Sequence, residues 1–258
     1  MKIARFVTSQ GTRYGVVNGN SVVELRSSPF TGEKPEPWGT KHQLADVRLL
    51  SPTEPTKIVL MSKNYRATVK KLGLQPSEEI LLGMKPVSAM VGPGDAIRLP
   101  AEAKEFCHES ELAVIIGRPC RDIPQNKIRD YILGYTCFND VSALDIMERT
   151  QKTMHPKAYD SFAPTGPLIE TDIDIDNTGI RSFINGELRV TANTSDMIFP
   201  IPELVSYISR IMTLMPGDII ATGNSGGRHM IKAGDTVDIE IENIGKLTNP
   251  VIPRTYAS

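Results

Sequence analysis

The chain has 258 residues, with 29 basic and 30 acidic side chains and a formal net charge of −1. This balance removes the electrostatic case for a nucleic-acid or anionic-membrane partner. The composition, 40% hydrophobic and 23% charged, predicts a soluble globular protein. No apolar run approaches the roughly 18 residues that span a bilayer, so we expect no membrane partner and, by default, a cytoplasmic location.

The chain begins with a region of strand and turn residues. β-Branched and aromatic residues surround the turn pair Asn18-Gly19, which predicts a small β-meander over residues 1–25. Residues 28–43 are rich in proline, glycine and polar groups and predict a loop. We therefore expect a small N-terminal β-rich domain over 1–52 and a larger main domain over 53–258.

The larger region repeats one local pattern, a Gly-Asp turn that leads into a strand. The pattern occurs at residues 94–95, 217–218 and 234–235. Few helices interrupt it: apolar spacing predicts one over 202–215, an aspartate cap predicts a second over 140–151, and a short third is expected over 65–72. The fold class is therefore mainly β (α+β), with few short helices. Three cysteines, Cys107, Cys120 and Cys137, fit no disulfide framework and are expected to be buried.

A pair of carboxylates begins one predicted strand. Because side chains alternate along a strand, Glu109 and Glu111 should point to the same side of the run that continues to Ile116. Asp140 follows the next strand-like run. Three hard oxygen ligands suit Mg²⁺ or Mn²⁺ better than zinc. Spacing alone does not decide the matter, since the same alternation occurs on a half-solvated strand at Asp238, Glu240 and Glu242.

Several motifs in order make the chain similar to a known family. They are Asn64-Tyr65, Lys85-Pro86-x-Ser88-Ala89, Glu109-x-Glu111-Leu-Ala-Val-Ile-Ile-Gly117, Asn139-Asp140-Val-Ser-Ala143, Lys157-x-x-Asp160-x-Phe162-Ala-Pro-x-Gly166-Pro167, Pro216-Gly217-Asp218 with Thr222-Gly223, and Asn249-Pro250-Val251. Together they resemble the fumarylacetoacetate hydrolase superfamily, in particular its 2-hydroxyhepta-2,4-diene-1,7-dioate isomerase and acylpyruvate hydrolase-like members. The resemblance implies a β-roll main domain with mostly antiparallel sheets and a homodimer.

The resemblance also implies roles for individual residues. The implied metal ligands are Glu109, Glu111 and Asp140, the catalytic residues are Lys157 and Thr222, and the substrate-binding residues are Asn64, Tyr65, Asp160 and Gly223. In this chemistry, Mg²⁺ or Mn²⁺ holds a 2-oxo or 2-hydroxy-dienoic acid and stabilises the metal-bound enolate as it forms. The implied partner is thus a small-molecule 2-oxo acid.

The chain departs from the family at the residues that activate water. On register with Asn64-Tyr65, Thr68 stands where a histidine is expected and Lys71 where its partner glutamate is expected. Neither threonine nor a protonated lysine is an effective general base. Further departures are Leu144 in place of an arginine and Asn224-Ser225 in place of Thr-Pro.

Three functions remain open at this point. The first is a metal-dependent isomerase or tautomerase, which needs a metal-stabilised enolate and a modest base but no hydrolytic water. The second is a C–C bond hydrolase or decarboxylase of acylpyruvate-type substrates whose base has moved. The candidates for that base are His155, His229, Glu78 and Glu79. The third is a non-catalytic relative that binds metal and a 2-oxo acid. His108 is expected to point away from Glu109, into the core, and His42 to lie in the N-terminal loop.

Overall fold

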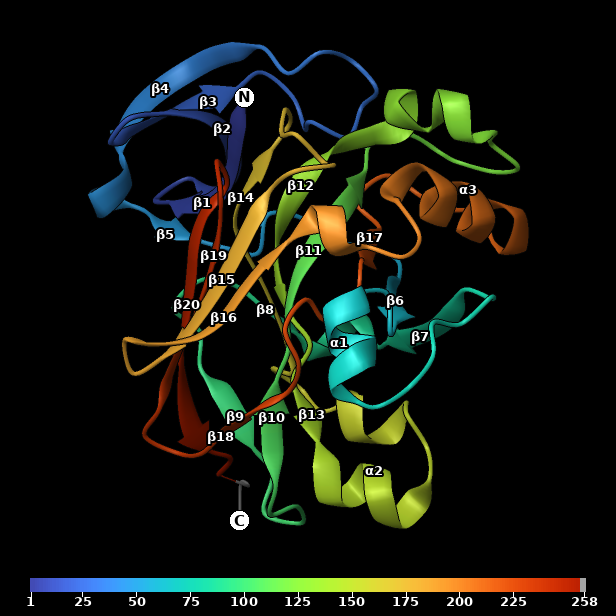
Figure 1. Ribbon diagram of the computed structural model, residues 1–258. Coiled ribbons are helices and arrows are strands. Elements are labelled where there is room, and N and C mark those ends of the chain that lie inside the picture. Colours follow the sequence, from blue (N-terminus) through green and yellow to red (C-terminus); the bar gives the residue numbers. More distant parts are fainter. Residues whose placement is uncertain (256–258) are drawn as a thin grey trace.

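The computed structural model describes residues 1–255 and is built mainly from strands (Figure 1). Its largest sheet has twelve strands, most of them antiparallel, which confirms the predicted fold class. In spatial order its main path is β4 (Pro37–Gln43), β3 (Ser21–Leu25), β2 (Gly11–Asn18), β1 (Lys2–Thr8), β14 (Ala163–Glu170), β12 (Ile132–Asn139), β11 (Ser110–Ile116), β17 (Ile219–Ala221), β6 (Ile58–Ser62) and β7 (Leu81–Lys85). Beside this path, β5 (Arg48–Leu49) pairs with β1 and β8 (Met90–Val91) pairs with β14.

Two smaller sheets complete the strand structure. The five-stranded sheet has the order β16 (Glu187–Asn193), β15 (Gly179–Ile184), β19 (Thr236–Ile241), β20 (Gly245–Pro253) and β9 (Ile97–Leu99). The three-stranded sheet has the order β13 (Ser142–Ala143), β10 (Phe106–His108) and β18 (His229–Ile231). No helix within residues 1–255 has the length and apolar character needed to cross a membrane.

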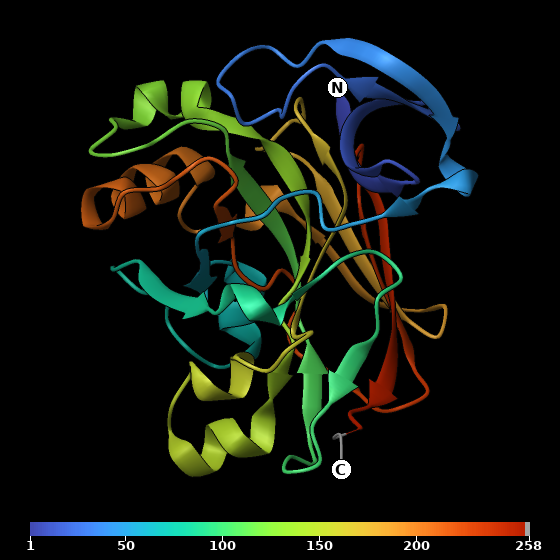
Figure 2. The same cartoon turned by 180° about the vertical axis from the view of Figure 1, so that it is seen from behind.

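The N-terminal meander forms as predicted, but the loop after it is partly a strand. Residues 37–43 pair with β3 as β4, even though almost all of their side chains are exposed. Pro37 is tolerated because it occupies the first position of an edge strand, where no ladder donor is needed. Through β1, whose Lys2 pairs with Glu170 of β14, the N-terminal strands continue the main sheet. Figure 2 shows these strands at the end of the molecule away from α2 (Leu144–Thr150). The domain division near residue 52 stays a prediction.

The Gly-Asp turns each lead into a strand, as the sequence predicts. In all three, the aspartate carboxylate accepts a hydrogen bond from a backbone N–H three residues earlier. The donors and distances are Gly92 to Asp95 at 2.9 Å, Met215 to Asp218 at 2.7 Å and Lys232 to Asp235 at 2.9 Å. This local bond closes the turn and directs the chain into β9, β17 and β19.

The helices agree with prediction only in part. Helix α1 (Arg66–Lys71) forms as expected. Helix α3 (Ile201–Ile211) ends four residues early because the chain leaves it to pair Leu214 with Cys120. Helix α2 begins at Leu144, not at Asp140, because lysine side chains engage the Asp140 carboxylate and the intervening residues form β13. Short 3₁₀ turns span Leu44–Asp46, Val87–Ala89, Gln125–Tyr131, His155–Lys157 and Thr194–Asp196.

The core lies on both faces of β11, in the middle of the main sheet. Leu112 and Val114 pack into a cluster with residues of β19 and α3, whereas Ala113 and Ile115 face a second cluster with β6 and β17. Burial on both faces explains why the apolar run is unbroken. The three cysteines are free and buried, as predicted. Because β11 is buried on both faces, it gives rigid support to Glu111 within it and to Glu109 directly before it.

Candidate active site

Three carboxylates converge where β11 and β12 pair. Ser110 of β11 lies opposite Asn139 of β12, which brings Glu109 and Glu111 beside Asp140. One carboxylate oxygen from each lies within 4.8 Å of the others, and the residues are only 7%, 2% and 2% exposed. The predicted alternation thus places both glutamates on the same side. Buried like charges repel strongly, so such a cluster needs positive charge, and hard oxygen donors fit a divalent cation such as Mg²⁺ or Mn²⁺.

Two lysines bind the Asp140 carboxylate from different segments. Lys157 Nζ donates to Asp140 Oδ2 and to Glu109 Oε2, the latter at 3.1 Å. Lys85 Nζ donates to Asp140 Oδ1 and, at 2.8 Å, to the Val141 carbonyl. Burial opposes ionisation of Asp140, but the two ammonium groups outweigh it and hold the pKa of Asp140 below its ordinary value.

The two lysines differ in their electrostatic state. Burial lowers the pKa of Lys85 to about 8, although Asp140 favours the charged form. For Lys157, the carboxylates of Asp140 and Glu109 outweigh burial and raise the pKa above its ordinary value. Lys85 was not among the residues predicted for the site. In the sequence, Lys85 stands out only as part of one of the family motifs, and nothing in the spacing of that motif indicates a role for it.

The Glu111 carboxylate is held by the backbone of a glycine. The backbone N–H of Gly223 donates to Glu111 Oε2 at 2.8 Å. Gly223 has a φ of +104°, and an added Cβ would lie 3.0 Å from Asn64 Cβ, so this close approach requires glycine. Burial, together with repulsion from Asp140 and Glu109, holds the pKa of Glu111 well above its usual value.

Glu109 is bound by two residues of the loop after β17. Its Oε1 accepts from Asn224 Nδ2 at 2.8 Å and from Arg228 Nε at 3.2 Å. The sequence prediction included neither contact. The sequence marks Asn224 only as a departure from the family pattern and gives no sign of Arg228, because a partner more than 100 residues away leaves no periodic signal.

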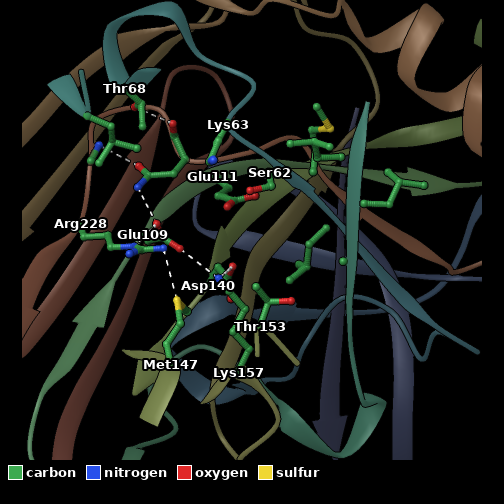
Figure 3. Close-up of a pocket in the computed structure, with 18 of the residues that line it drawn as sticks. Ser62, Lys63, Thr68, Glu109, Glu111, Asp140, Met147, Thr153, Lys157 and Arg228 are labelled. Carbon is green, nitrogen blue, oxygen red and sulfur yellow. Dashed lines mark hydrogen bonds and ion pairs between the residues drawn. The ribbon is translucent and has the colours of Figure 1, made fainter. Parts of the chain in front are cut away.

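The acid cluster lies in a cavity of about 550 Å³ (Figure 3). Glu109, Glu111, Asp140 and Lys157 line it together with Arg228. Residues 63–72, which include α1, are called the lid here. An apolar wall is contributed by the lid, β6, β7 and α2, through Leu60, Leu72, Leu81, Leu82, Met84 and Met147. The cavity thus combines a charged floor with an apolar side, as small-molecule sites commonly do.

Five residues predicted for the site lie outside the cavity lining: Asn64, Tyr65, Asp160, Thr222 and Gly223, which instead binds Glu111 through its backbone. The side chain of Asn64 binds backbone, donating to the Thr222 carbonyl at 2.9 Å and accepting from the Phe199 N–H at 2.9 Å. The Thr222 hydroxyl donates to the Leu112 carbonyl at 2.9 Å, and Tyr65 is fully buried. Asp160 is exposed and lies 3.3 Å from Arg254. The cavity is therefore supported from behind by Asn64, Tyr65 and Thr222. The exposed position of Asp160 gives no support to a role in substrate binding.

The positions of the missing dyad do face the cavity. Thr68 and Lys71 of α1 both line it, and the Thr68 hydroxyl donates to the Asn224 carbonyl at 2.9 Å. None of the predicted replacement bases, nor Leu144, lines the cavity: His155, Glu78 and Glu79 are exposed elsewhere, and His229 lies beside His108.

His108 is fully buried and also lies outside the lining, as expected. Burial, together with His229, lowers the pKa of His108 to about 3. His42, expected in a loop, lies in β4, where its Nε2 is 2.8 Å from Glu24 Oε1. Among the described residues that line the cavity there is thus no histidine.

Comparison with known proteins agrees with this architecture. The family description "Fumarylacetoacetate (FAA) hydrolase C-terminal" matches residues 57–252. The chain belongs to the fumarylacetoacetate hydrolase family. A second description, "Rv2993c-like, N-terminal", matches residues 1–52.

Individual relatives of the family carry names of several activities. The chain is 40% identical to Protein Rv2993c of Mycobacterium tuberculosis over 98% of both chains, and 35% identical to oxaloacetate tautomerase fahd2, mitochondrial, of Xenopus laevis over 81% of this chain and 69% of that one.

Solved structures give the same spread of activities. The structure of 5-carboxymethyl-2-hydroxymuconate delta-isomerase from Mycobacterium smegmatis superposes with a TM-score of 0.92 at 40% identity, over 98% of this chain and all of that one. Maleylpyruvate hydrolase from Sphingobium sp. SYK-6, in complex with manganese(II) and pyruvate, gives 0.81 at 33% identity over 99% of this chain and all of that one. Family members thus include isomerases, tautomerases and hydrolases.

Proposed function

We propose that this protein is a divalent-metal-dependent enzyme that enolises a 2-oxo or 2-hydroxy-dienoic acid and so isomerises or tautomerises it. The observation that carries the proposal is the convergence of Glu109, Glu111 and Asp140 in the floor of a cavity also lined by Lys157. These three carboxylates would hold Mg²⁺ or Mn²⁺, which when bound supplies positive charge that stabilises an enolate. Such a set of buried acids also argues against a non-catalytic relative.

The charges around the cluster favour an anionic substrate. Two of the three carboxylates, Asp140 and Glu109, form ion pairs with Lys85, Lys157 and Arg228. Three cations thus balance the three carboxylates when all six groups are ionised. A divalent cation leaves the cluster with a surplus of two positive charges, which matches a dianion. Lys157 lines the cavity and can donate a hydrogen bond from Nζ to the developing oxyanion of the substrate.

The lid adds two further cations. Lys63 and Lys71 line the cavity, are exposed, and take part in no ion pair within residues 1–255. The apolar wall can shield the carbon chain of a bound substrate from water, and Lys63 or Lys71 can bind a second carboxylate of that substrate. We therefore infer that the preferred substrate is a dicarboxylic 2-oxo acid. The name of the Xenopus relative, an oxaloacetate tautomerase, supports this substrate class.

The composition of the lining favours isomerisation over hydrolysis. Hydrolysis requires a base that activates water, and the described lining residues include no histidine, while the dyad positions hold Thr68 and Lys71. Enolisation needs stabilised negative charge on the substrate oxygen and a modest base that takes the C3 proton, but no activated water. C–C bond hydrolysis is the second candidate, since a maleylpyruvate hydrolase is a structural neighbour at 33% identity.

The experiment compares proton exchange with cleavage. Purified protein is given Mn²⁺ and oxaloacetate, the keto-enol conversion is followed by ultraviolet absorbance, and H–D exchange at C3 and pyruvate release by NMR, with a protein-free reaction subtracted. Glu111→Gln should abolish catalysed exchange, whereas Glu240→Gln, a carboxylate on the exposed side of β19, should not. Exchange without excess pyruvate supports the isomerase. Cleavage of maleylpyruvate or acetylpyruvate would support the hydrolase, and equal exchange by Glu111→Gln would refute the proposed site.

A homodimer and a cytoplasmic location complete the proposal. Strand β7 ends the main sheet, and Leu81, Met84 and the neighbouring Val87 are exposed there. An open edge with apolar side chains is suited to pairing with a second copy. Light scattering after size exclusion should give about twice the 28.4 kDa chain mass, and a mass of one chain would refute the dimer.

A further inference from the structure

Two departures from the family pattern contact each other in this chain. Thr68 is on the lid helix α1 and Asn224 is in the loop after β17, yet the Thr68 hydroxyl donates to the Asn224 carbonyl at 2.9 Å. Both residues are buried, at 6% and 7% exposure. The residue that replaces the expected histidine therefore binds the residue that replaces an expected threonine.

The side chain of Asn224 has one orientation that satisfies its neighbours. Its Oδ1 accepts from the N–H groups of Gly226 at 3.0 Å and Gly227 at 2.9 Å. Since these two donors need an acceptor, the amide nitrogen must point the other way, where it donates to Glu109 Oε1 at 2.8 Å. The turn itself thus determines which end of Asn224 meets the carboxylate.

The loop has little room to move away from this arrangement. An added Cβ at Gly226 would lie 2.3 Å from Val190 Cγ1, and one at Gly227 would lie 2.9 Å from Lys71 Nζ. The loop is therefore packed between β16 on one side and α1 on the other. Asn224 and Arg228 both occupy Oε1 of Glu109, and Oε2 is left facing Lys157 and the acid cluster.

We propose that Asn224 is a positioning residue that fixes the orientation of the Glu109 carboxylate for the divalent cation, and that Thr68 fastens this unit to the lid helix. The inference rests on the proposed function, because it requires a cation at Glu109. In this chain, α1 binds Asn224 through Thr68, and Asn224 in turn binds Glu109, instead of α1 supplying a water-activating dyad. Partners of this kind orient ligands and commonly change metal affinity by about 10- to 100-fold when removed.

The test measures Mn²⁺ binding by electron paramagnetic resonance, without substrate. Asn224→Ala should weaken Mn²⁺ affinity by about 10-fold or more, and Thr68→Val, which has the same shape but no donor, by a smaller factor of about three. Thr68→Ser restores the donor and should bind as wild type does. The zero-field splitting of bound Mn²⁺ should change in Asn224→Ala, because a reoriented carboxylate alters the ligand field.

Controls separate positioning from damage to the loop. Ser225→Ala removes a neighbouring buried hydroxyl that donates to the Ser110 carbonyl at 3.0 Å and does not contact Glu109, so its Mn²⁺ affinity should match wild type. Urea unfolding in EDTA shows whether each variant is folded. Wild-type affinity in both Asn224→Ala and Thr68→Val would overturn this inference and leave the metal site standing. No Mn²⁺ binding by wild-type protein would overturn the inference and the proposed function together.

Discussion

Replacing Gly223 by alanine should damage both stability and the candidate metal site. An L-residue at its φ of +104° costs about 1–3 kcal/mol in backbone strain. The new Cβ would also lie 3.0 Å from Asn64 Cβ and 3.2 Å from the Met61 carbonyl oxygen, in a buried and tightly packed place. Forcing such contacts adds about 1–3 kcal/mol. The backbone N–H that binds Glu111 must shift at the same time.

Gly234→Ala is the matched control for this change. Gly234 has a similar φ of +94°, but no atom lies within 4 Å of its added Cβ, so only the backbone strain applies. Urea unfolding in EDTA should therefore show Gly223→Ala to be less stable than Gly234→Ala by about 2 kcal/mol, or about 4–8 °C in Tm. Mn²⁺ affinity should fall only in Gly223→Ala. Equal losses of stability in the two variants, with unchanged Mn²⁺ affinity, would refute the reasoning.

Three further predictions concern charge. Asp140→Asn should lower Mn²⁺ affinity at least about 10-fold by calorimetry, because it removes a central carboxylate, and unchanged affinity would exclude Asp140 as a ligand. His108 has a pKa of about 3 in the folded protein against an ordinary 6.5, so below pH 6.5 the unfolded chain binds a proton that the folded protein does not. The free energy of unfolding should therefore fall by about 2 kcal/mol by pH 5, as measured by urea unfolding. His108→Gln should not show this loss. Lys71→Gln should raise KM for oxaloacetate about 5- to 10-fold and leave KM for 2-oxobutyrate, which has one carboxylate, nearly unchanged. Lys70→Gln, which is exposed on the same helix but outside the cavity, should change neither KM. Equal effects of Lys71→Gln on both substrates would contradict a role in binding the second carboxylate.

The sequence by itself determined the features that depend on neighbours along the chain. The period of two in a strand places Glu109 and Glu111 on one side, and this holds wherever the strand packs. The Gly-Asp turns are closed by an aspartate and an N–H three residues apart, so they too are readable locally. Motifs in order over the larger region also indicated the family, the mainly β fold and a carboxylate cluster.

Only the tertiary structure decided which distant groups meet those carboxylates. Lys85 reaches Asp140 from 55 positions away and Arg228 reaches Glu109 from 119 positions away, and no periodicity links such pairs. Thr68 and Asn224 each looked like an isolated departure until the fold placed them in contact. Asp160, predicted near substrate, lies instead on the surface. Local spacing sets the direction of a side chain, but the partner it finds depends on how sheets and loops pack, and that is a property of the whole chain.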